Sequence, residues 1–239
     1  MDAHRLWNRH LAGFFSMSTP PSDRPPPGSR RYAVIVPVKP PAVAKSRLGE
    51  LGDGARVDLA TAFAADTVAA ALASPLVARL LAVTDDHVLA RSMSDLGADV
   101  IPDGFRGDLN RTLVQAAAEM HRREPALLLV ALCADLPALR PDELARALAA
   151  ADPQRMSFVA DSRGVGTTTV VSPTLEEFRP AFGPDSRRLH LDAGAHEIDL
   201  VDVPSLRRDV DDPDDLAEAM RLGVGPRTRL VTTVLHLEP

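Results

Sequence analysis

The sequence has very little cysteine and few aromatic side chains. Of its 239 residues one is a cysteine, Cys133, and aromatic residues make up 4%. A single cysteine excludes an internal disulfide bond and a cysteine metal cluster, so we expect a reducing compartment, the cytoplasm. Because aromatic rings are scarce, we expect an aliphatic core and little stacking on a bound sugar.

Long apolar runs and an excess of basic residues are also absent. No run approaches the roughly 20 residues that a membrane-spanning helix needs. The formal net charge is −6, with acidic and basic residues interspersed, whereas a nucleic-acid-binding surface usually shows a basic excess. We therefore expect small-molecule substrates and neither a nucleic acid nor a membrane as partner.

The first 31 residues differ in composition from the rest of the chain. Residues 18–31 are rich in Pro, Ser and Arg, which is typical of disordered segments. We expect a disordered extension over residues 1–31, one domain over 32–226 and a C-terminal tail over 227–239. The hydrophobic content of 45% is enough for one sizeable core.

Strand-like and helix-like patterns alternate through the first half of the domain. We expect strands over 32–38, 79–84, 98–101 and 126–132, separated and followed by helices over 53–73, 86–96, 109–123 and 141–150. This order predicts a single α/β domain with a doubly wound, mostly parallel sheet. In the second half we expect strands over 156–160, 168–171 and 198–203, an extended piece over 206–210, and helices over 186–191 and 213–222.

One apolar stretch stands out as a central strand. Residues 126–132 are uninterrupted aliphatic residues, and Asp135 follows before the chain stops at Pro137. Such a run predicts a strand buried on both faces. An acid after its carboxyl end stands where α/β sheets bind ligands. From the strand alone, Asp135 could hold a divalent metal ion or cap the following turn.

A basic loop follows the first strand. Lys39, Lys45 and Arg47, together with Ser46, lie within nine residues of one another. The loop is neither a Walker loop nor a GxGxxG loop, because the glycines are missing. Its cations can nevertheless neutralise a triphosphate. The alternative is an ordinary solvated loop.

Acidic residues gather again near residue 210. Asp209 and Asp211 are two positions apart, so in an extended chain their side chains point to the same side. Mg²⁺ needs one or two carboxylates, with phosphate and water oxygens completing its coordination. The alternative is an acid-rich helix start over residues 211–215, and Asp214 and Asp215 are the best candidates for that capping role.

A second ligand site is indicated between residues 164 and 190. The GVGTT segment at 164–168 offers backbone N–H groups and hydroxyls suited to an anion. Ser186 follows a turn and opens a short helix, where a carboxylate could bind. His190 shares a helix face with Ser186 but indicates nothing on its own, and a solvent loop with a capping serine is the alternative reading.

These motifs occur together in one order and resemble a known family. They are PVKPPAVAKSRLG, LN at 109–110, CADLPAL, GVGTTTV, FGPDSRRLH and DVDDPDDL. The set resembles the phospholactate/phosphoenolpyruvate guanylyltransferases of coenzyme F-420 biosynthesis, within the nucleotide-diphospho-sugar transferase superfamily. The resemblance covers residues 32–226. It departs at Ala134, where relatives often have Gly. The run of threonines at 167–169 leaves it uncertain by one position which threonine matches the acceptor-binding threonine of the family.

The resemblance implies an enzyme that transfers GMP from GTP to phosphoenolpyruvate or 2-phospho-L-lactate, with Mg²⁺ as cofactor. Pyrophosphate would leave, and enolpyruvyl-diphospho-guanosine or lactyl-diphospho-guanosine would pass to the transferase that loads the deazaflavin. A homodimer stays open. The implied residues are Lys39, Lys45, Arg47 and Asp135 for catalysis; Lys39, Lys45, Ser46, Arg47 and Asn110 for the nucleotide; Thr167, Gly183 and Ser186 for the acceptor; and Asp135, Asp209 and Asp211 for the metal.

Three other functions remain as alternatives. A molybdopterin nucleotidyltransferase would carry a Gly-rich first loop, which this sequence lacks. A sugar-phosphate nucleotidyltransferase is disfavoured by the few aromatic residues. A non-catalytic nucleotide-binding protein is disfavoured because both the acids and the first-loop cations are present. For the guanine base, Asp85 and Asp103 are the candidate readers.

Overall fold

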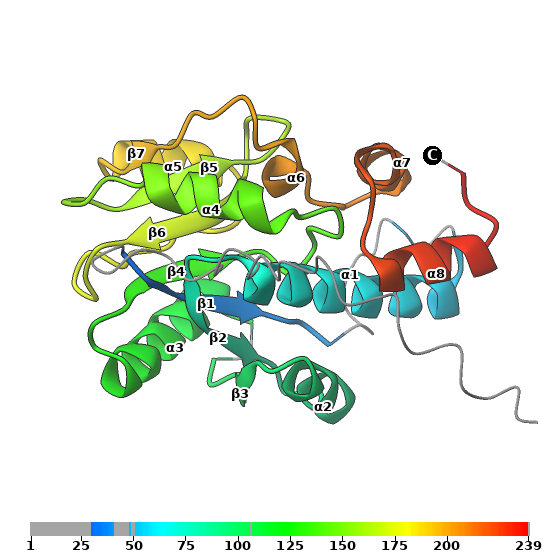
Figure 1. The fold of residues 1–239 in the computed structure, drawn as a ribbon, viewed down its shortest axis with the longest axis horizontal. Helices are drawn as coiled ribbons and strands as arrows, with labels where there is room; N and C mark the ends of the chain where they lie inside the picture. Colours follow the sequence, from blue (N-terminus) through cyan, green and yellow to red (C-terminus); the bar gives the residue numbers. More distant parts are fainter. Residues whose placement is uncertain (1–29, 41–47, 49–50, 106, 239) are drawn as a thin grey trace, which may run out of the picture.

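The computed structural model describes residues 30–40, 48, 51–105 and 107–238. Within them, seven strands form one sheet in the order β3-β2-β1-β4-β6-β5-β7, with helices on both faces (Figure 1). The strands are β1 (Tyr32–Pro37), β2 (Val77–Val83), β3 (Asp99–Ile101), β4 (Leu128–Leu132), β5 (Ser157–Ala160), β6 (Thr167–Ser172) and β7 (His196–Glu197). The helices are α1 (Asp53–Ala73), α2 (His87–Asp95), α3 (Leu109–Arg123), α4 (Pro141–Ala150), α5 (Ser186–Asp192), α6 (Pro204–Arg207), α7 (Pro213–Leu222) and α8 (Pro226–Val234).

The sheet is mostly parallel, as predicted. Strands β3, β2, β1 and β4 run in one direction, and β7 runs parallel to β5. Only β6 is antiparallel, to both of its neighbours β4 and β5. The amino end of β6, at Thr167, therefore lies at the sheet edge where β1, β2, β4 and β5 have their carboxyl ends. This edge is where α/β sheets bind ligands.

Two aliphatic cores cover the two faces of the sheet. Along β1, Val34 and Val36 pack into the core that α1, α2 and α4 cover. The alternate residues Ala33 and Ile35 pack into the core that α3 covers. Because β4 lies between β1 and β6 and both of its faces are covered, residues 129–132 are nearly inaccessible, which confirms the predicted central strand.

Two expectations for the second half are wrong. The strand expected over 198–203 is not formed, because β7 ends at Glu197 and Val201 is 96% exposed with no neighbouring strand to pair with. The extended piece expected over 206–210 begins instead inside helix α6. Pro204 occupies the first turn of that helix, where its fixed φ favours helix and its missing N–H costs nothing. Apolar residues such as Ile198 and Val203 are buried here without belonging to a strand.

Helix α8 occupies most of the segment 227–239 that we expected to be a tail. It packs alongside α1 (Figure 1). Its first turn is capped from α1, where the buried carboxylate of Asp66 accepts hydrogen bonds from the N–H groups of Thr228 (2.7 Å) and Arg227 (3.2 Å). A Cβ at Gly225 would stand 2.4 Å from the Asp66 carboxyl carbon, so only glycine allows this approach. The domain boundaries themselves stay a prediction.

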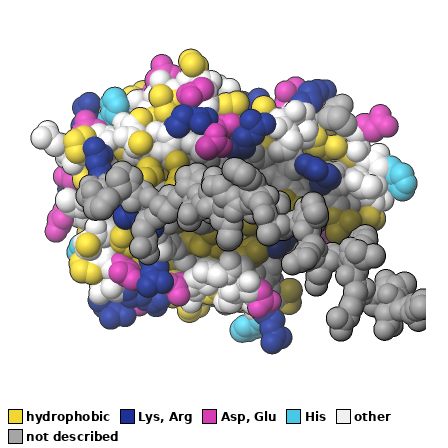
Figure 2. Space-filling model, in the orientation of Figure 1, with side chains coloured by type: hydrophobic (Ala, Val, Ile, Leu, Met, Phe, Trp, Pro, Cys, Tyr) yellow, Lys and Arg dark blue, Asp and Glu magenta, His cyan; other side chains and the backbone are white. Residues whose placement is uncertain are grey.

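None of the helices among the described residues has both the length and the apolarity that crossing a bilayer requires. On the face drawn in Figure 2, the coloured basic and acidic side chains are interspersed rather than gathered by sign.

Replacing Asp66 with alanine tests the contribution of this cap. The change leaves the buried N–H of Thr228 and the partly buried N–H of Arg227 without their acceptor, so we expect the free energy of unfolding to fall by about 2 kcal/mol. Urea unfolding measures the loss. Asp58→Ala, an exposed position on the same helix, is the control and should change stability by less than about 0.5 kcal/mol. Equal losses in the two variants would contradict the capping role.

Candidate functional site

The segment after β4 carries Asp135 across the edge of the sheet and is held from two sides. The N–H of Cys133 donates to the carbonyl of Thr168 on β6 over 2.9 Å. On the other side, the buried hydroxyl of Thr67 on α1 accepts from the N–H of Leu136 over 3.0 Å. Asp135 itself is half-buried. The backbone around Asp135 is therefore fixed to the sheet through β6 and to helix α1.

The second acidic segment lies directly against Asp135. The N–H of Val210 donates to the Asp135 carbonyl over 3.1 Å, and Asp209 and Asp211 flank Val210 in the chain. The structure thus brings together the two segments for which we predicted a metal. Among the residues that it describes, however, no three His, Cys, Asp or Glu side chains form a group able to hold a metal ion. Two carboxylates completed by substrate phosphates remain a suitable set for Mg²⁺.

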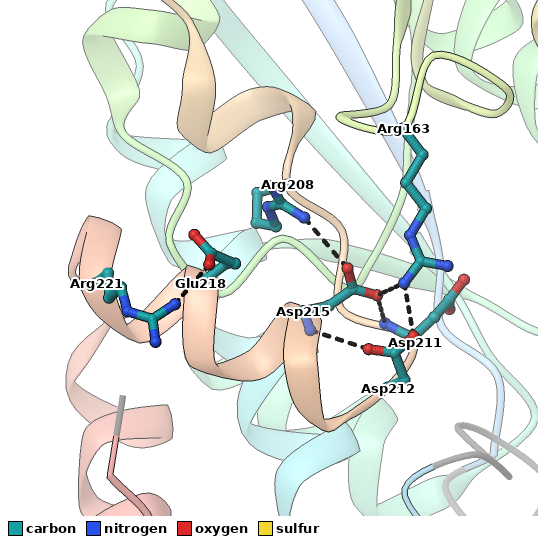
Figure 3. A network of polar contacts seen from close by, with 7 residues as sticks. All are labelled: Arg163, Arg208, Asp211, Asp212, Asp215, Glu218 and Arg221. Carbon is teal, nitrogen blue, oxygen red and sulfur yellow. Dashed lines mark hydrogen bonds and ion pairs between the residues drawn. The ribbon is translucent and has the colours of Figure 1, made fainter.

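The buried carboxylate of Asp215 stabilises the segment that contains Asp209 and Asp211 (Figure 3). Asp215 on α7 is 5% exposed. It accepts hydrogen bonds from the Arg208 side chain at 3.2 Å and from the backbone N–H of Asp211 at 3.2 Å. A third bond comes from Arg163 at 2.8 Å. Asp215 thereby contacts the chain on both sides of Asp209, through the side chain of Arg208 and the backbone of Asp211.

The start of α7 is capped by a different acid from those expected. Asp212 is the N-cap and accepts from the N–H of Asp215 over 2.9 Å, so the prediction that Asp214 or Asp215 would cap is wrong. The same guanidinium of Arg163 reaches Asp212 at 2.6 Å. The backbone N–H of Asp215 and then Arg163 hold the pKa of Asp212 below its usual range. Arg163 thus bridges α7 to the β5–β6 loop, in which it lies.

The β5–β6 loop, residues 161–166, is also tied to the chain just before Asp209. The N–H of Ser162 donates to the carbonyl of Arg207 over 2.7 Å. Within the loop, the Asp161 carboxylate accepts from the N–H of Val165 over 2.9 Å. A Cβ at Gly166 would lie 2.6 Å from that carboxylate, so glycine is required there. This loop leads directly into Thr167.

The three predicted acceptor residues come together around α5. The N–H of Arg187, next to Ser186, donates to the carbonyl of Val165 over 3.1 Å, and the N–H of Ser186 donates to the carbonyl of Gly183 over 3.2 Å. Gly183 has φ +135°, a backbone conformation that residues other than glycine rarely adopt. The predicted trio thus lies on linked loops at one edge of the sheet.

His190 joins Thr167 to this arrangement, and the sequence alone had not assigned it a role. Its Nδ1 lies 3.0 Å from the Thr167 hydroxyl, and its Nε2 accepts from the N–H of Ala181 over 2.9 Å. The imidazole is fully buried. Of the three consecutive threonines, Thr167 is the one whose hydroxyl meets α5, while those of Thr168 and Thr169 lie 3.5 Å from each other. In the sequence, the only indication was that Ser186 and His190 are four positions apart and so share one face of a helix.

The side chain of Asn110 bonds the backbone of the loop that leads to Gly183. Its side-chain oxygen accepts from the N–H of Phe182 over 2.8 Å, and its amide nitrogen donates to the carbonyl of Phe182 over 3.0 Å. This two-bond clamp fixes the loop before Gly183. Contact of Asn110 with the nucleotide stays a prediction.

A cavity of about 670 Å³ opens at the carboxyl ends of β1 and β2. Lys39 lines it from one side, and both candidate guanine readers, Asp85 and Asp103, line it from the other. The N–H of Asp103 donates to Asp85 over 3.1 Å, and the Thr112 hydroxyl donates to Asp103 over 2.5 Å. Lys45, Ser46 and Arg47 lie outside the described residues. The cavity therefore offers one described cation and three carboxylates, those of Asp85 and Asp103 and that of Asp86, which caps α2.

Burial of His190 makes the stability of the fold depend on pH. Burial lowers its pKa from 6.5 to about 4, although the backbone of Ser186 opposes this change. Between these pH values the unfolded chain binds a proton that the folded chain does not, so the free energy of unfolding rises with pH. We expect His190 to contribute a loss of up to about 3 kcal/mol as the pH falls from 6.5 to 4.

The measurement is urea unfolding of the wild type and His190→Gln at pH 4.5 and pH 7. The two proteins share every other titrating group. The wild type should therefore lose more stability between the two pH values than the variant does, and identical losses would show that His190 is not the cause.

Comparison with known proteins places the chain in a family. The model of the family described as "Guanylyl transferase CofC like" matches residues 32–237. A phosphoenolpyruvate guanylyltransferase of Streptomyces coelicolor is 49% identical over 206 residues, which cover 86% of this chain and 97% of that one. A protein of the same name from Thermomonospora curvata is 50% identical over 197 residues, covering 82% and 86%.

Solved structures with low sequence identity share the fold. A nucleotidyl transferase from Methanothermobacter aligns with a TM-score of 0.57 at 17% identity, over 81% of this chain and 98% of that one. CMP:2-keto-3-deoxy-manno-octonic acid synthetase in complex with CTP aligns with a TM-score of 0.52 at 15% identity, over 80% and 98%. A structure described as a putative nucleotide-diphospho-sugar transferase from Desulfovibrio desulfuricans aligns with a TM-score of 0.62 at 14% identity, over 87% of this chain and 97% of that one, which confirms the predicted type of fold. The chain belongs to the CofC-like guanylyltransferase family.

Proposed function

We propose that the chain is a phosphoenolpyruvate guanylyltransferase, which transfers GMP from GTP to the phosphate of phosphoenolpyruvate and releases pyrophosphate. The names of relatives that are about half identical over most of their length support phosphoenolpyruvate over 2-phospho-L-lactate. The observation that carries the proposal is the hydrogen bond from Val210 to Asp135, since it puts the two acidic segments directly against each other at the end of the central strand.

The nucleotide would occupy the cavity at the ends of β1 and β2. The carboxylates of Asp85 and Asp103 can accept from the N1–H and N2–H₂ edge of guanine, an edge that adenine lacks. Lys39 at the cavity wall would neutralise the triphosphate, assisted by Lys45, Ser46 and Arg47. Charge neutralisation and positioning are the main contributions that a protein makes to transfer of this kind.

Asp135 and Asp209, with Asp211 next to them, would hold Mg²⁺, which on binding would withdraw charge from the phosphate oxygens of GTP. All donors here are hard carboxylate oxygens, the ligands that Mg²⁺ prefers. The network around Asp215 stabilises the segment that carries Asp209 and Asp211 (Figure 3).

The acceptor would bind on the other side of Asp135, between Thr167, Gly183 and Ser186. Hydroxyls and backbone N–H groups there suit a carboxylate and a phosphate. The acceptor phosphate oxygen would attack the α-phosphorus of GTP while the bond to pyrophosphate breaks, giving enolpyruvyl-diphospho-guanosine without a covalent enzyme intermediate.

The wider setting is part of the same proposal. The product would pass to the transferase that loads the deazaflavin of coenzyme F-420, and the enzyme would work in the cytoplasm. A homodimer remains an expectation that only solution measurements can test.

A direct assay tests the activity. The protein is incubated with GTP and Mg²⁺ and either phosphoenolpyruvate or 2-phospho-L-lactate, and pyrophosphate is measured with the nucleotide product. We expect turnover with phosphoenolpyruvate above both the other acid and a reaction without acceptor. If neither acid yields pyrophosphate beyond the reaction without acceptor, the proposal fails.

Asp135→Asn tests the metal role of the central acid. Loss of one carboxylate charge at the reacting phosphates should lower kcat by about 10²-fold or more. The matched control is Asp214→Asn, the same chemical change at an exposed position on neighbouring α7, which should leave kcat within about twofold. Near-normal kcat in Asp135→Asn would return this residue to a structural role.

A further inference from the structure

The hydrogen bonds around His190 determine which ring nitrogen carries the proton. A backbone N–H can only donate, and the N–H of Ala181 points at Nε2 over 2.9 Å. Nε2 must therefore accept and carries no proton. In a neutral imidazole the proton then resides on Nδ1, which lies 3.0 Å from the Thr167 hydroxyl oxygen.

The Thr167 hydroxyl is consequently the acceptor in this pair. A hydroxyl has one proton and two lone pairs. Since Nδ1 carries a proton, it cannot accept one from Thr167, and the hydroxyl proton of Thr167 must point elsewhere. In the opposite tautomer, Nε2–H would face the N–H of Ala181, so two donors would meet without an acceptor. The Thr167 hydroxyl would then have to donate its proton to Nδ1.

We propose that His190 is a positioning residue that fixes the Thr167 hydroxyl as a donor to the anionic acceptor substrate. This inference rests on the proposed function, because Thr167 meets an acceptor only if the β5–β6 loop and α5 form the acceptor site. His190 acts through Thr167 and contacts no substrate itself. The chemistry recognised is a carboxylate or phosphate oxygen, which a directed hydroxyl proton binds well.

The surroundings hold the imidazole in this orientation. Phe158 on β5 stacks on the ring at 5.3 Å between centroids, with 28° between the planes. Phe182 approaches edge-on at 6.0 Å and 82°, and Asn110 clamps the backbone of Phe182 through two hydrogen bonds. Burial favours the neutral form of the ring. The ring can neither rotate freely nor gain a second proton near neutral pH.

The tautomer can be observed without any activity measurement. Long-range ¹⁵N–¹H correlation spectra of the full chain separate imidazoles protonated on Nδ1 from those protonated on Nε2. The sequence has seven histidines, and the His190 signals are those missing from the spectrum of His190→Asn. We expect the Nδ1-protonated tautomer for His190, with no titration between pH 6 and pH 8. The Nε2-protonated tautomer would overturn the proposal.

Two substitutions separate the two bonds of the ring. Asn places an amide nitrogen one bond from Cγ, as Nδ1 is, and so keeps a donor toward Thr167. Gln places its amide group two bonds from Cγ, as Nε2 is, so its amide oxygen can keep only the hydrogen bond from the N–H of Ala181. We expect His190→Gln to raise the KM for phosphoenolpyruvate by roughly fivefold, corresponding to one lost hydrogen bond, with the KM for GTP unchanged. His190→Asn should raise the KM for phosphoenolpyruvate less.

The double variant Thr167→Val/His190→Gln completes the test. If His190 acts through the Thr167 hydroxyl, His190→Gln should have no further effect on the acceptor KM once that hydroxyl is removed. Equal increases in both KM values, or an effect of His190→Gln that is undiminished beside Thr167→Val, would contradict the proposal. Absence of wild-type turnover would instead refute the proposed function, whereas the spectrum of the wild type would still decide the tautomer.

Discussion

The hydrogen bond between the N–H of Val210 and the carbonyl of Asp135 is the contact on which the site depends. It joins the end of the central strand to the segment that follows helix α6. Neither segment forms regular structure at this point, so no strand ladder or helix would otherwise fix their distance. The remaining interactions at the site preserve this junction: Thr67 holds the segment after β4, and Asp215 holds the segment around Val210.

The single antiparallel strand explains how the acceptor residues reach the same place. In a purely parallel sheet, only carboxyl ends of strands would meet at the binding edge. Reversing β6 brings its amino end to that edge, together with the loop that precedes it. That loop binds the chain before Asp209 through Ser162 and α7 through Arg163. Hydrogen bonds therefore join the loop that leads to Thr167 directly to the segment that contains Asp209 and Asp211.

Much of the fold followed from the sequence because local patterns determine it. The aliphatic patterns of β1 and β4 and the helix patterns between them predicted the parallel half, and the position of Asp135 after the central strand predicted that it would lie at the edge where such sheets bind ligands. The absence of a strand over 198–203 could not be foreseen, since Ile198 and Val203 are apolar but no partner strand extends beside them. Helix α8 was missed because its cap, Asp66, lies 161 residues before Arg227. The role of His190 depended on the direction of one backbone N–H.

Helix α1 carries two adjacent residues with unrelated partners. Asp66 binds the first turn of α8, and Thr67 binds the segment that contains Asp135. Gly225, just before α8, also donates its N–H to the carbonyl of Pro137 over 2.8 Å. One turn of α1 is therefore a meeting point for three parts of the chain that are made at very different times during translation. A nascent chain that has emerged only as far as α4 already possesses α1 and Asp135, yet it lacks every partner that fixes the acidic segment. The polypeptide must consequently be translated as far as Val210 before its two acidic segments can face each other, and into α7 before Asp215 can stabilise the second of them.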